Sequence, residues 1–314
     1  MVLYKANIKP VASFASPLQS DTFFGAFCWS YRYLYGEDEL VKLLKKSVHE
    51  IPQIIFSNAF PSGYLPLPMG SYDQDRERYG NVEKSEAKKA YEKNKKYKKC
   101  SFISKDKFWG IQKGVWRGYS KYLGSEHITE VEIPHNIISR SSGNVNDTGE
   151  GGNLFVTSEF FIEDGKTFDL YILSGLEQDK IEQVLILMFE LGIGADKSTG
   201  KGCFELLEFV VEKELCSIEG ANGYMALSNF IPNSNDPIKG WYKTFVKYGK
   251  MDREYAAGQF PFKKPLIYIQ AGALFRTEDM KSYYGTFMKN ISAISGVVVN
   301  ACTIAIPMII PESK

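Results

Sequence analysis

A glycine-rich segment, Leu191-Gly-Ile-Gly-Ala-Asp-Lys-Ser-Thr-Gly-Lys-Gly-Cys-Phe204, connects a predicted helix to a predicted strand and is the most informative part of the sequence for the fold. Its four glycines permit positive φ angles and let backbone N–H groups approach an anion without obstruction by a Cβ atom. Successive N–H groups of this kind can form an anion-binding nest. Lys197 and Lys201 add positive charge, and two hydroxyl side chains add donors. The composition favours a phosphate-binding loop, although a flexible, positively charged helix–strand connection would also fit it.

The loop differs from the P-loop of nucleotide-binding proteins. The P-loop consensus has four residues between its first glycine and the Gly-Lys pair, and Ser or Thr follows that pair. Here five residues separate Gly194 from Gly200, and Gly202 stands where the magnesium-binding hydroxyl should be. The loop also follows a helix and precedes a strand, which reverses the P-loop order. The sequence therefore argues against a nucleotidase.

The segments around the loop alternate between strand and helix patterns. Residues 176–191 have the apolar spacing of a helix, and residues 203–211 follow as a strand. Upstream, residues 153–162 and 167–173 alternate as strands, and residues 163–166 between them have the composition of a hairpin turn. Strand, strand, helix, glycine-rich loop and strand form part of a ferredoxin-like βαββαβ unit.

The N-terminal part adds a strand, a helix and a charged insertion. Residues 2–10 predict a strand, and the helix that follows has Ser20 or Asp21 as its expected N-cap. Residues 70–100 are charged and almost free of aliphatic side chains. Between positions 84 and 99 they contain eight lysines against two glutamates, which predicts a solvated helix or a mobile insertion, with RNA attraction as the alternative.

The composition excludes several classes of protein. The 314 residues suggest two domains or one large domain, and 44% hydrophobic residues suffice for a sizeable core. No apolar run reaches the ~18 residues of a membrane span, and the first ten residues lack the apolar core of a secretory signal, so we expect a cytoplasmic protein. The five cysteines are scattered without a CxxC pair, which argues against a disulfide framework and a zinc site. The net charge of +1 gives no signal for nucleic acid.

The order helix, GxGxxxSxGxG, strand resembles the signature loop of the RAMP superfamily of CRISPR proteins. Further segments resemble one member of it, the subunit that binds the 5′ handle of the guide RNA in type III-A CRISPR-Cas (Csm) effector complexes. They follow the order of that subunit and comprise Ser20-Asp-Thr-Phe-Phe-Gly-Ala-Phe-Cys-Trp29 and residues 56–66, 134–140 with 149–155, 255–265 and 270–275.

This resemblance implies an α+β fold with two ferredoxin-like (RRM-like) domains. Residues 1–213 would form the first domain, with the glycine-rich loop, the lysine-rich insertion at about 70–100 and a thumb β-hairpin at about 134–155; residues 214–314 would form the second. It further implies a subunit without catalytic activity or cofactor that anchors the 5′ handle of the crRNA. Its expected partners are a large polymerase-like subunit, a backbone RAMP subunit and, through the thumb, target RNA.

The expected RNA contacts fall into four groups. The loop contributes Gly192, Gly194, Asp196, Lys197, Ser198, Thr199, Gly200, Lys201 and Gly202. The start of the first helix contributes Ser20, Asp21 and Thr22, where free N–H groups and the helix dipole favour anions. The thumb contributes His135, Asn136, Ser139 and Arg140. Lys263 and Lys264, beside Phe260 and Phe262, suit a backbone contact with stacking.

Two other functions fit parts of the sequence. The RAMP superfamily includes endoribonucleases that process precursor crRNA, and among His49, His127 and His135 only the last is placed to be a general base. A protein that makes only protein contacts in an assembly would agree with the many aromatic residues, 19 Tyr and 21 Phe. The sequence contains no HExxH or GxSxG motif and no clustered carboxylates for two-metal chemistry.

Overall fold

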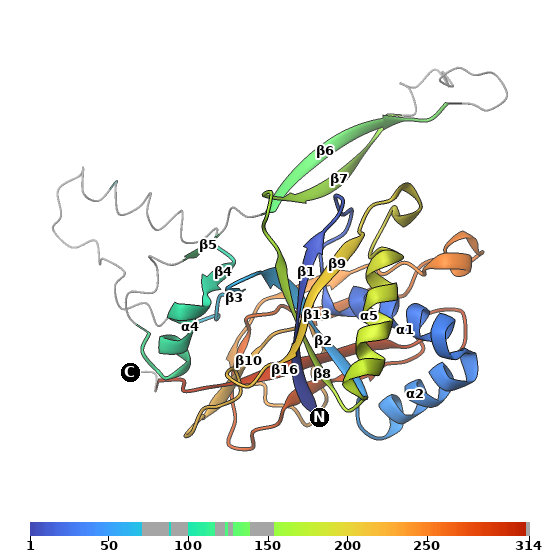
Figure 1. Ribbon diagram of the computed structural model, residues 1–314. Helices are drawn as coiled ribbons and strands as arrows, with labels where there is room; N and C mark the ends of the chain where they lie inside the picture. Colours follow the sequence, from blue (N-terminus) through green and yellow to red (C-terminus); the bar gives the residue numbers. More distant parts are fainter. Residues whose placement is uncertain (71–87, 89–99, 117–122, 125–127, 139–153, 312–314) are drawn as a thin grey trace.

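The computed structural model describes residues 1–70, 88, 100–116, 123–124, 128–138 and 154–311 (Figure 1). Most of the lysine-rich stretch, together with Ser139 and Arg140, lies outside these residues. Helices and antiparallel sheets are combined in one chain, so the predicted α+β class is confirmed. Among the described helices, none has the length and hydropathy that a membrane crossing requires.

The first sheet has four antiparallel strands in the order β2-β8-β1-β9. Its elements in chain order are β1 (Val2–Pro10), α1 (Ser20–Tyr35), α2 (Glu37–His49), β2 (Ile54–Pro61), β8 (Phe168–Ser174), α5 (Gln178–Glu190) and β9 (Phe204–Val211). In α5 the apolar residues Ile181, Val184, Leu185 and Met188 recur at helical spacing and are fully buried. The helix therefore forms because its apolar stripe covers the sheet.

Both faces of the first sheet are covered, and the alternation of side chains decides what each residue contacts. Ala6 and Ile8 of β1 point to the core under α1 and α5, whereas Leu3 of the same strand belongs to a second core. The second core also contains Tyr171 of β8 and Leu227 from the C-terminal half. All seven residues of β8 are buried, as expected for a central strand between two apolar layers.

The second sheet has five strands in the order β11-β14-β10-β16-β15. They are β10 (Gly223–Ala226), β11 (Gly240–Trp241), β14 (Leu274–Arg276), β15 (Tyr283–Met288) and β16 (Val299–Met308). The chain forms no α-helix between residues 214 and 311, all of which the structure describes. Helix α4 (Lys105–Gln112), from the first half, packs against this sheet instead, and Gln112 donates its Nε2–H to the carbonyls of Leu215 and Pro307. A small sheet of β3 (Tyr64–Pro66), β4 (Phe102–Ser104) and β5 (Leu123–Gly124) adjoins α4.

Strands β6 (Ile128–Asn136) and β7 (Leu154–Ile162) pair along their whole length and extend away from the body of the protein (Figure 1). The prediction that residues 153–162 and 167–173 form one hairpin is wrong. The turn itself forms, with the N–H of Lys166 donating to the carbonyl of Glu163 at 3.0 Å. However, β7 pairs with β6 while β8 pairs with β1 and β2. The reason is burial: every residue of β8 is buried and both of its faces supply core residues, so this strand takes a central place in the sheet.

A second two-stranded segment, β12 (Thr244–Lys247) with β13 (Leu266–Ile269), begins a long excursion that we call the 244–269 arm. Phe245 and Tyr268 stack inside it with ring centroids 5.8 Å apart. The 3-10 helix η3 (Arg253–Ala257) lies in the arm. Salt bridges connect the arm to α1 and to the glycine-rich loop, so these three segments lie side by side.

Candidate nucleic-acid interface

The glycine-rich loop connects α5 to β9 and folds back on itself. Its glycines have left-handed φ angles, among them +82° at Gly192 and +74° at Gly202. The N–H of Ile193 donates to the carbonyl of Gly202 at 2.8 Å, and the N–H of Gly202 donates to the carbonyl of Ser13 at 2.8 Å. A Cβ atom at Gly202 would lie 2.1 Å from the carbonyl oxygen of Ile193. Glycine is therefore required at position 202 by the fold of the loop, whatever the loop binds.

The amides of the loop divide into used and unused groups. The N–H of Ala195 donates to Ser16 Oγ, and those of Thr199 and Gly200 donate to carbonyls within the loop. The N–H groups of Asp196, Lys197 and Ser198 have no hydrogen-bond partner among the described residues. Asp196 and Ser198 are exposed, as are Thr199 and Gly200. The loop thus offers a short exposed tip to a ligand, smaller than the whole stretch that the sequence suggested.

Both loop lysines meet carboxylates from other segments. Lys201 Nζ lies 2.5 Å from Glu159 Oε1 of β7 and 3.6 Å from Asp196 Oδ2, and Lys197 Nζ forms a salt bridge with Asp252 of the arm. Ser13 Oγ also donates to Glu159, at 2.7 Å. The hydrogen bond from Lys201 is the largest cause that lowers the pKa of Glu159, and Glu159 in turn raises the pKa of Lys201. Direct phosphate contact by these lysines stays a prediction.

Replacing Lys201 by methionine is expected to raise the pKa of the Glu159 carboxyl toward its ordinary value of 4.5, because the largest cause of the lowering is removed. Since folding lowers the pKa of Glu159, the pair stabilises the protein above the unfolded pKa, and this contribution is lost as the pH falls through the folded pKa. For Lys201 folding raises the pKa, so the contribution is lost as the pH rises through its folded value. An NMR titration of the Glu159 carboxyl carbon measures the change.

The matched control for that titration is Lys42→Met. Lys42 forms an exposed ion pair with Glu39 on α2, at 2.7 Å, and does not act on Glu159. The pKa of Glu159 should be unchanged in this variant. An equal rise in both variants, or none in Lys201→Met, would contradict the assignment of the lowered pKa to Lys201.

The start of α1 is capped differently from the prediction. The N-cap residue is Gln19, without a side-chain capping bond, so the expectation that Ser20 or Asp21 occupies this position is wrong. Instead the N–H of Ser20 donates to Asn58 Oδ1 of β2 at 3.1 Å, and Ser20 Oγ donates to the carbonyl of Asn229. Ser20 is buried, with 4% of its surface exposed. A neighbouring strand thus supplies the acceptor that a local side chain was expected to provide.

Lys247, which the sequence reading missed, is the cation at this helix start. Its Nζ lies 2.6 Å from Asp21 Oδ1, and it also donates to Gln19 Oε1 at 2.7 Å and to Thr22 Oγ1 at 3.4 Å. In the sequence Lys247 is one lysine in an alternating strand, and nothing around it indicates a binding site. The fold of the arm brings it to α1.

Lys263 and Lys264 differ in how far their side chains are exposed to solvent. Burial lowers the pKa of the Lys263 ammonium, and the negative charge of Asp21 partly opposes this effect. Burial also raises the pKa of the neighbouring Cys28 thiol to about 12. Lys264 is exposed, and the backbone N–H of Lys264 donates to the carbonyl of Ile291 at 2.6 Å. Phe260 and Phe262 are 53% and 65% exposed, so the side chains available for stacking here are these two rings and not the Lys263 stem.

His135 and Asn136 lie on the outer half of β6, apart from the other three groups. His135 Nε2 is hydrogen-bonded to Thr157 Oγ1 at 2.8 Å, and its ring stacks on Phe155 with centroids 5.2 Å apart. The hairpin is connected to the loop near its base, through the Lys201–Glu159 pair. Three of the four predicted groups are therefore brought together around α1, and the fourth is carried outward.

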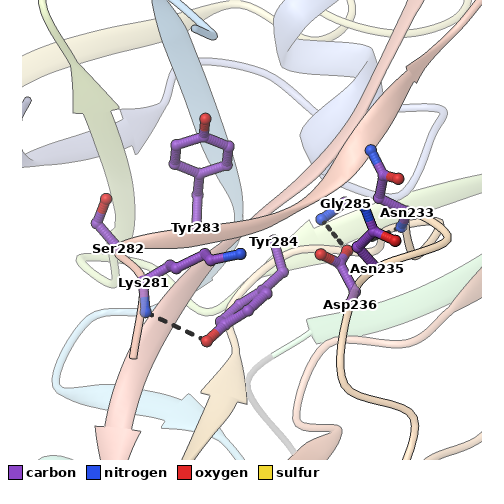
Figure 2. Close-up of a pocket in the computed structure, with 8 residues that line it drawn as sticks. All are labelled: Asn233, Asn235, Asp236, Lys281, Ser282, Tyr283, Tyr284 and Gly285. Carbon is purple, nitrogen blue, oxygen red and sulfur yellow. Dashed lines mark hydrogen bonds between the residues drawn. The ribbon is translucent and has the colours of Figure 1, made fainter. Parts of the chain in front are cut away.

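A shallow polar hollow of about 500 Å³ lies elsewhere, on the second sheet (Figure 2). Its lining consists of Asn233, Asn235, Asp236, Lys281, Ser282, Tyr283, Tyr284 and Gly285. Asp236 Oδ2 accepts hydrogen bonds from the N–H groups of Asn233 and Gly285, and Tyr284 donates its hydroxyl to the carbonyl of Asp279. These bonds fix local turns. None of the predicted RNA contacts lines the hollow, and the described residues include no group of His, Cys, Asp or Glu side chains that could hold a metal ion.

Comparisons with known proteins agree with the fold. A family model described as the RAMP superfamily matches residues 15–205. A chain from the Csm1–Csm4 cassette in complex with cA4 has a TM-score of 0.65 at 18% identity, and one from the cassette in complex with AMPPNP has 0.62 at 17%; both alignments cover 100% of each chain. A chain from the Csm3–Csm4 subcomplex of the type III-A CRISPR-Cas interference complex has 0.60 at 17% and covers 98% of this chain and 99% of that chain. No curated protein matches. At such identities the likeness establishes a shared fold along the whole chain.

Proposed function

The chain belongs to the RAMP superfamily, and on this premise we propose that it binds the 5′ handle of the guide RNA in a type III-A CRISPR-Cas effector complex without cutting it. Membership of the family and the fold likeness to chains from Csm1–Csm4 and Csm3–Csm4 assemblies support this assignment. They also support docking onto a large polymerase-like subunit and a backbone RAMP subunit as the partners of this chain.

The observation that carries the proposal is the meeting of three predicted RNA-binding segments. The loop joins the arm through Lys197 and Asp252, and the start of α1 joins it through Asp21 and Lys247. A single-stranded RNA that crosses this junction would meet the exposed loop tip, Lys264 and the exposed rings of the arm. Phosphate contacts and base stacking are the two interactions that hold single strands without sequence preference.

The architecture supports the two-domain organisation that we propose. The first sheet has the chain order β-α-β-β-α-β, counting β1, α1 with α2, β2, β8, α5 and β9, and its strand order corresponds to that of a ferredoxin-like domain. We assign the second sheet as the remnant of a second such unit, in which α4 takes the place of a covering helix.

The β6–β7 hairpin is our candidate for the thumb that contacts target RNA. Its outer part exposes apolar side chains that no other described element covers, including Ile137 at 52%, Leu154 at 66% and Val156 at 56%. Such a ribbon is suited to insertion beside stacked bases. Its outer part extends away from the body of the protein, whereas Glu159 near its base is paired with Lys201 of the loop (Figure 1).

The purified protein is expected to bind a single-stranded RNA carrying the handle sequence and to leave it intact, with and without magnesium. Fluorescence anisotropy measures binding, and a denaturing gel of the same samples after extended incubation measures cleavage. A processing endoribonuclease would instead release guide-length products. Those products would have to vanish in His135→Ala, whose side chain is the candidate base and is currently held by Thr157. Absence of RNA binding by the wild-type protein, alone and with its partner subunits, would refute the proposal.

A further inference from the structure

Four consecutive residues of the arm, 252–255, attach it to the loop and to α1. Each uses its side chain for a different contact: Asp252 with Lys197, Arg253 with Tyr33, Glu254 with Arg32, and Tyr255 with Trp29. The contacts alternate between ion pairs and aromatic rings. This segment therefore sits where the loop, the arm and α1 meet.

Arg253 differs from its charged neighbours Asp252 and Glu254 in that its side chain has no polar partner among the described residues. Its guanidinium carbon lies 5.7 Å from the centre of the Tyr33 ring, and Nε is buried without a hydrogen bond. No described residue forms an ion pair with it. The neighbouring Arg32, by contrast, is neutralised by Glu37 at 2.9 Å and Glu254 at 3.0 Å. A buried N–H group that makes no hydrogen bond destabilises the folded protein. The unpaired Nε–H of Arg253 therefore points to a ligand that binds this side chain.

The backbone holds Arg253 in a conformation that bulky residues rarely adopt, with φ at +53°. Asp252 maintains it: Asp252 Oδ1 accepts the N–H of Arg253 at 2.8 Å, while Oδ2 is held by the ammonium of Lys197. Lys197 therefore fixes Asp252, and Asp252 fixes Arg253. Strained backbone conformations persist only where surrounding contacts hold them in place, and they are found most often at binding sites.

We propose that Arg253 binds a phosphate of the RNA backbone beside the glycine-rich loop, and that Lys197 is a positioning residue that acts through Asp252. This inference rests on the proposed function and names a residue that carries it. The guanidinium fork matches two phosphate oxygens, and the nearby carboxylates Asp252 and Glu254 are paired with Lys197 and Arg32 and not with Arg253. Tyr33, 51% exposed under the guanidinium, offers an adjacent ring for a base.

The test measures the affinity of the full-length protein for single-stranded handle RNA across a series of salt concentrations. Arg253→Ala should weaken binding roughly tenfold, the loss of one charged hydrogen-bonding group, and should reduce the salt slope by about 0.7. Arg253→Gly should lose the same affinity yet melt at a higher temperature than Arg253→Ala, because glycine accepts the positive φ. Lys281→Ala, on the second sheet and 51% exposed, is the control that leaves binding unchanged.

A double-mutant cycle separates positioning from direct contact. If Lys197 acts through Arg253, Lys197→Met weakens binding but adds no further loss to Arg253→Ala. Additive losses, with the salt slope reduced by about 1.4, would show that Lys197 binds its own phosphate and overturn its positioning role. Unchanged affinity and slope in Arg253→Ala, while the wild type binds, would overturn the inference and leave the proposed function standing. Weakened association with the large subunit in that variant, with normal RNA binding, would assign Arg253 to a protein carboxylate and overturn it as well.

Discussion

Gly202→Ala is expected to lower the free energy of unfolding by about 3 kcal/mol or more and to abolish RNA binding by the loop. Two effects add at this position. The backbone has a φ of +74°, which alanine adopts only with strain, and the new Cβ would lie 2.1 Å from the carbonyl oxygen of Ile193. That carbonyl is backbone and cannot rotate away as a side chain could. Urea denaturation measures the stability, and anisotropy measures the binding.

Gly200→Ala is the matched control for this substitution. Gly200 has a similar φ of +84°, but a Cβ built there meets no atom within 4 Å. The expected cost is therefore the conformational term alone, about 1 kcal/mol. A loss at Gly200 equal to that at Gly202 would mean that φ and not close packing governs the loop. Equal and negligible losses would show that the loop does not keep this conformation in solution.

Asn58→Ala is expected to lower the free energy of unfolding by about 3 kcal/mol, because one side chain serves three groups at the junction of the two sheets. Asn58 Oδ1 accepts the N–H of Ser20 at 3.1 Å and that of Asn229 at 3.4 Å, and Asn58 Nδ2 donates to Asn229 Oδ1 at 3.2 Å. Alanine would leave the N–H at the start of α1 without its acceptor in a buried site. Chemical denaturation gives the loss, and an unchanged m-value would show that unfolding exposes the same surface.

Asn235→Ala provides the comparison for Asn58. Asn235 is exposed, and its side chain forms no hydrogen bond with the described residues, so the change should stay within about 0.5 kcal/mol. If Asn58→Ala were equally harmless, water or a local side chain would have to cap α1. The start of that helix would then be independent of the second half of the chain.

The Asn58–Asn229 contact also has a consequence for RNA binding. It fixes the start of α1, and α1 carries Asp21, which orders Lys247. A variant that loosens the junction should therefore weaken RNA binding indirectly, with no change in the salt slope, because no phosphate contact is removed. Arg253→Ala, in contrast, should change both affinity and slope. The slope thus distinguishes damage to the scaffold from loss of a contact.

Local patterns in the sequence sufficed for the elements that depend on near neighbours. The apolar spacing in residues 176–191 predicted α5, and the alternation in residues 2–10 predicted β1. The glycine-rich loop was identified because its glycines must meet conformational demands that no other residue meets at low cost. The segment order was enough to indicate a RAMP protein, and the family match over residues 15–205 confirms this.

Two predictions that depended on distant partners were wrong, and three residues were missed. The pairing of β7 with β8 was wrong because two alternating segments joined by a good turn resemble a hairpin even when each has a better partner elsewhere. The N-cap of α1 was wrong because its acceptor, Asn58, lies 38 positions away. Lys247, Asp252 and Arg253 were missed for the same reason: as isolated residues in the sequence they look like ordinary surface charges.

Sequence patterns were therefore enough to predict the helices and strands of the first sheet, the position of the glycine-rich loop and the family. Which charges are neutralised depends on the folded arrangement, because it pairs Lys197 with Asp252 and Lys201 with Glu159 and leaves Arg253 unpaired among the described residues. The physical reason is range. Backbone conformation is set by neighbours within a few positions, whereas the Coulomb energy of a charge depends on whatever the fold brings within a few ångströms of it.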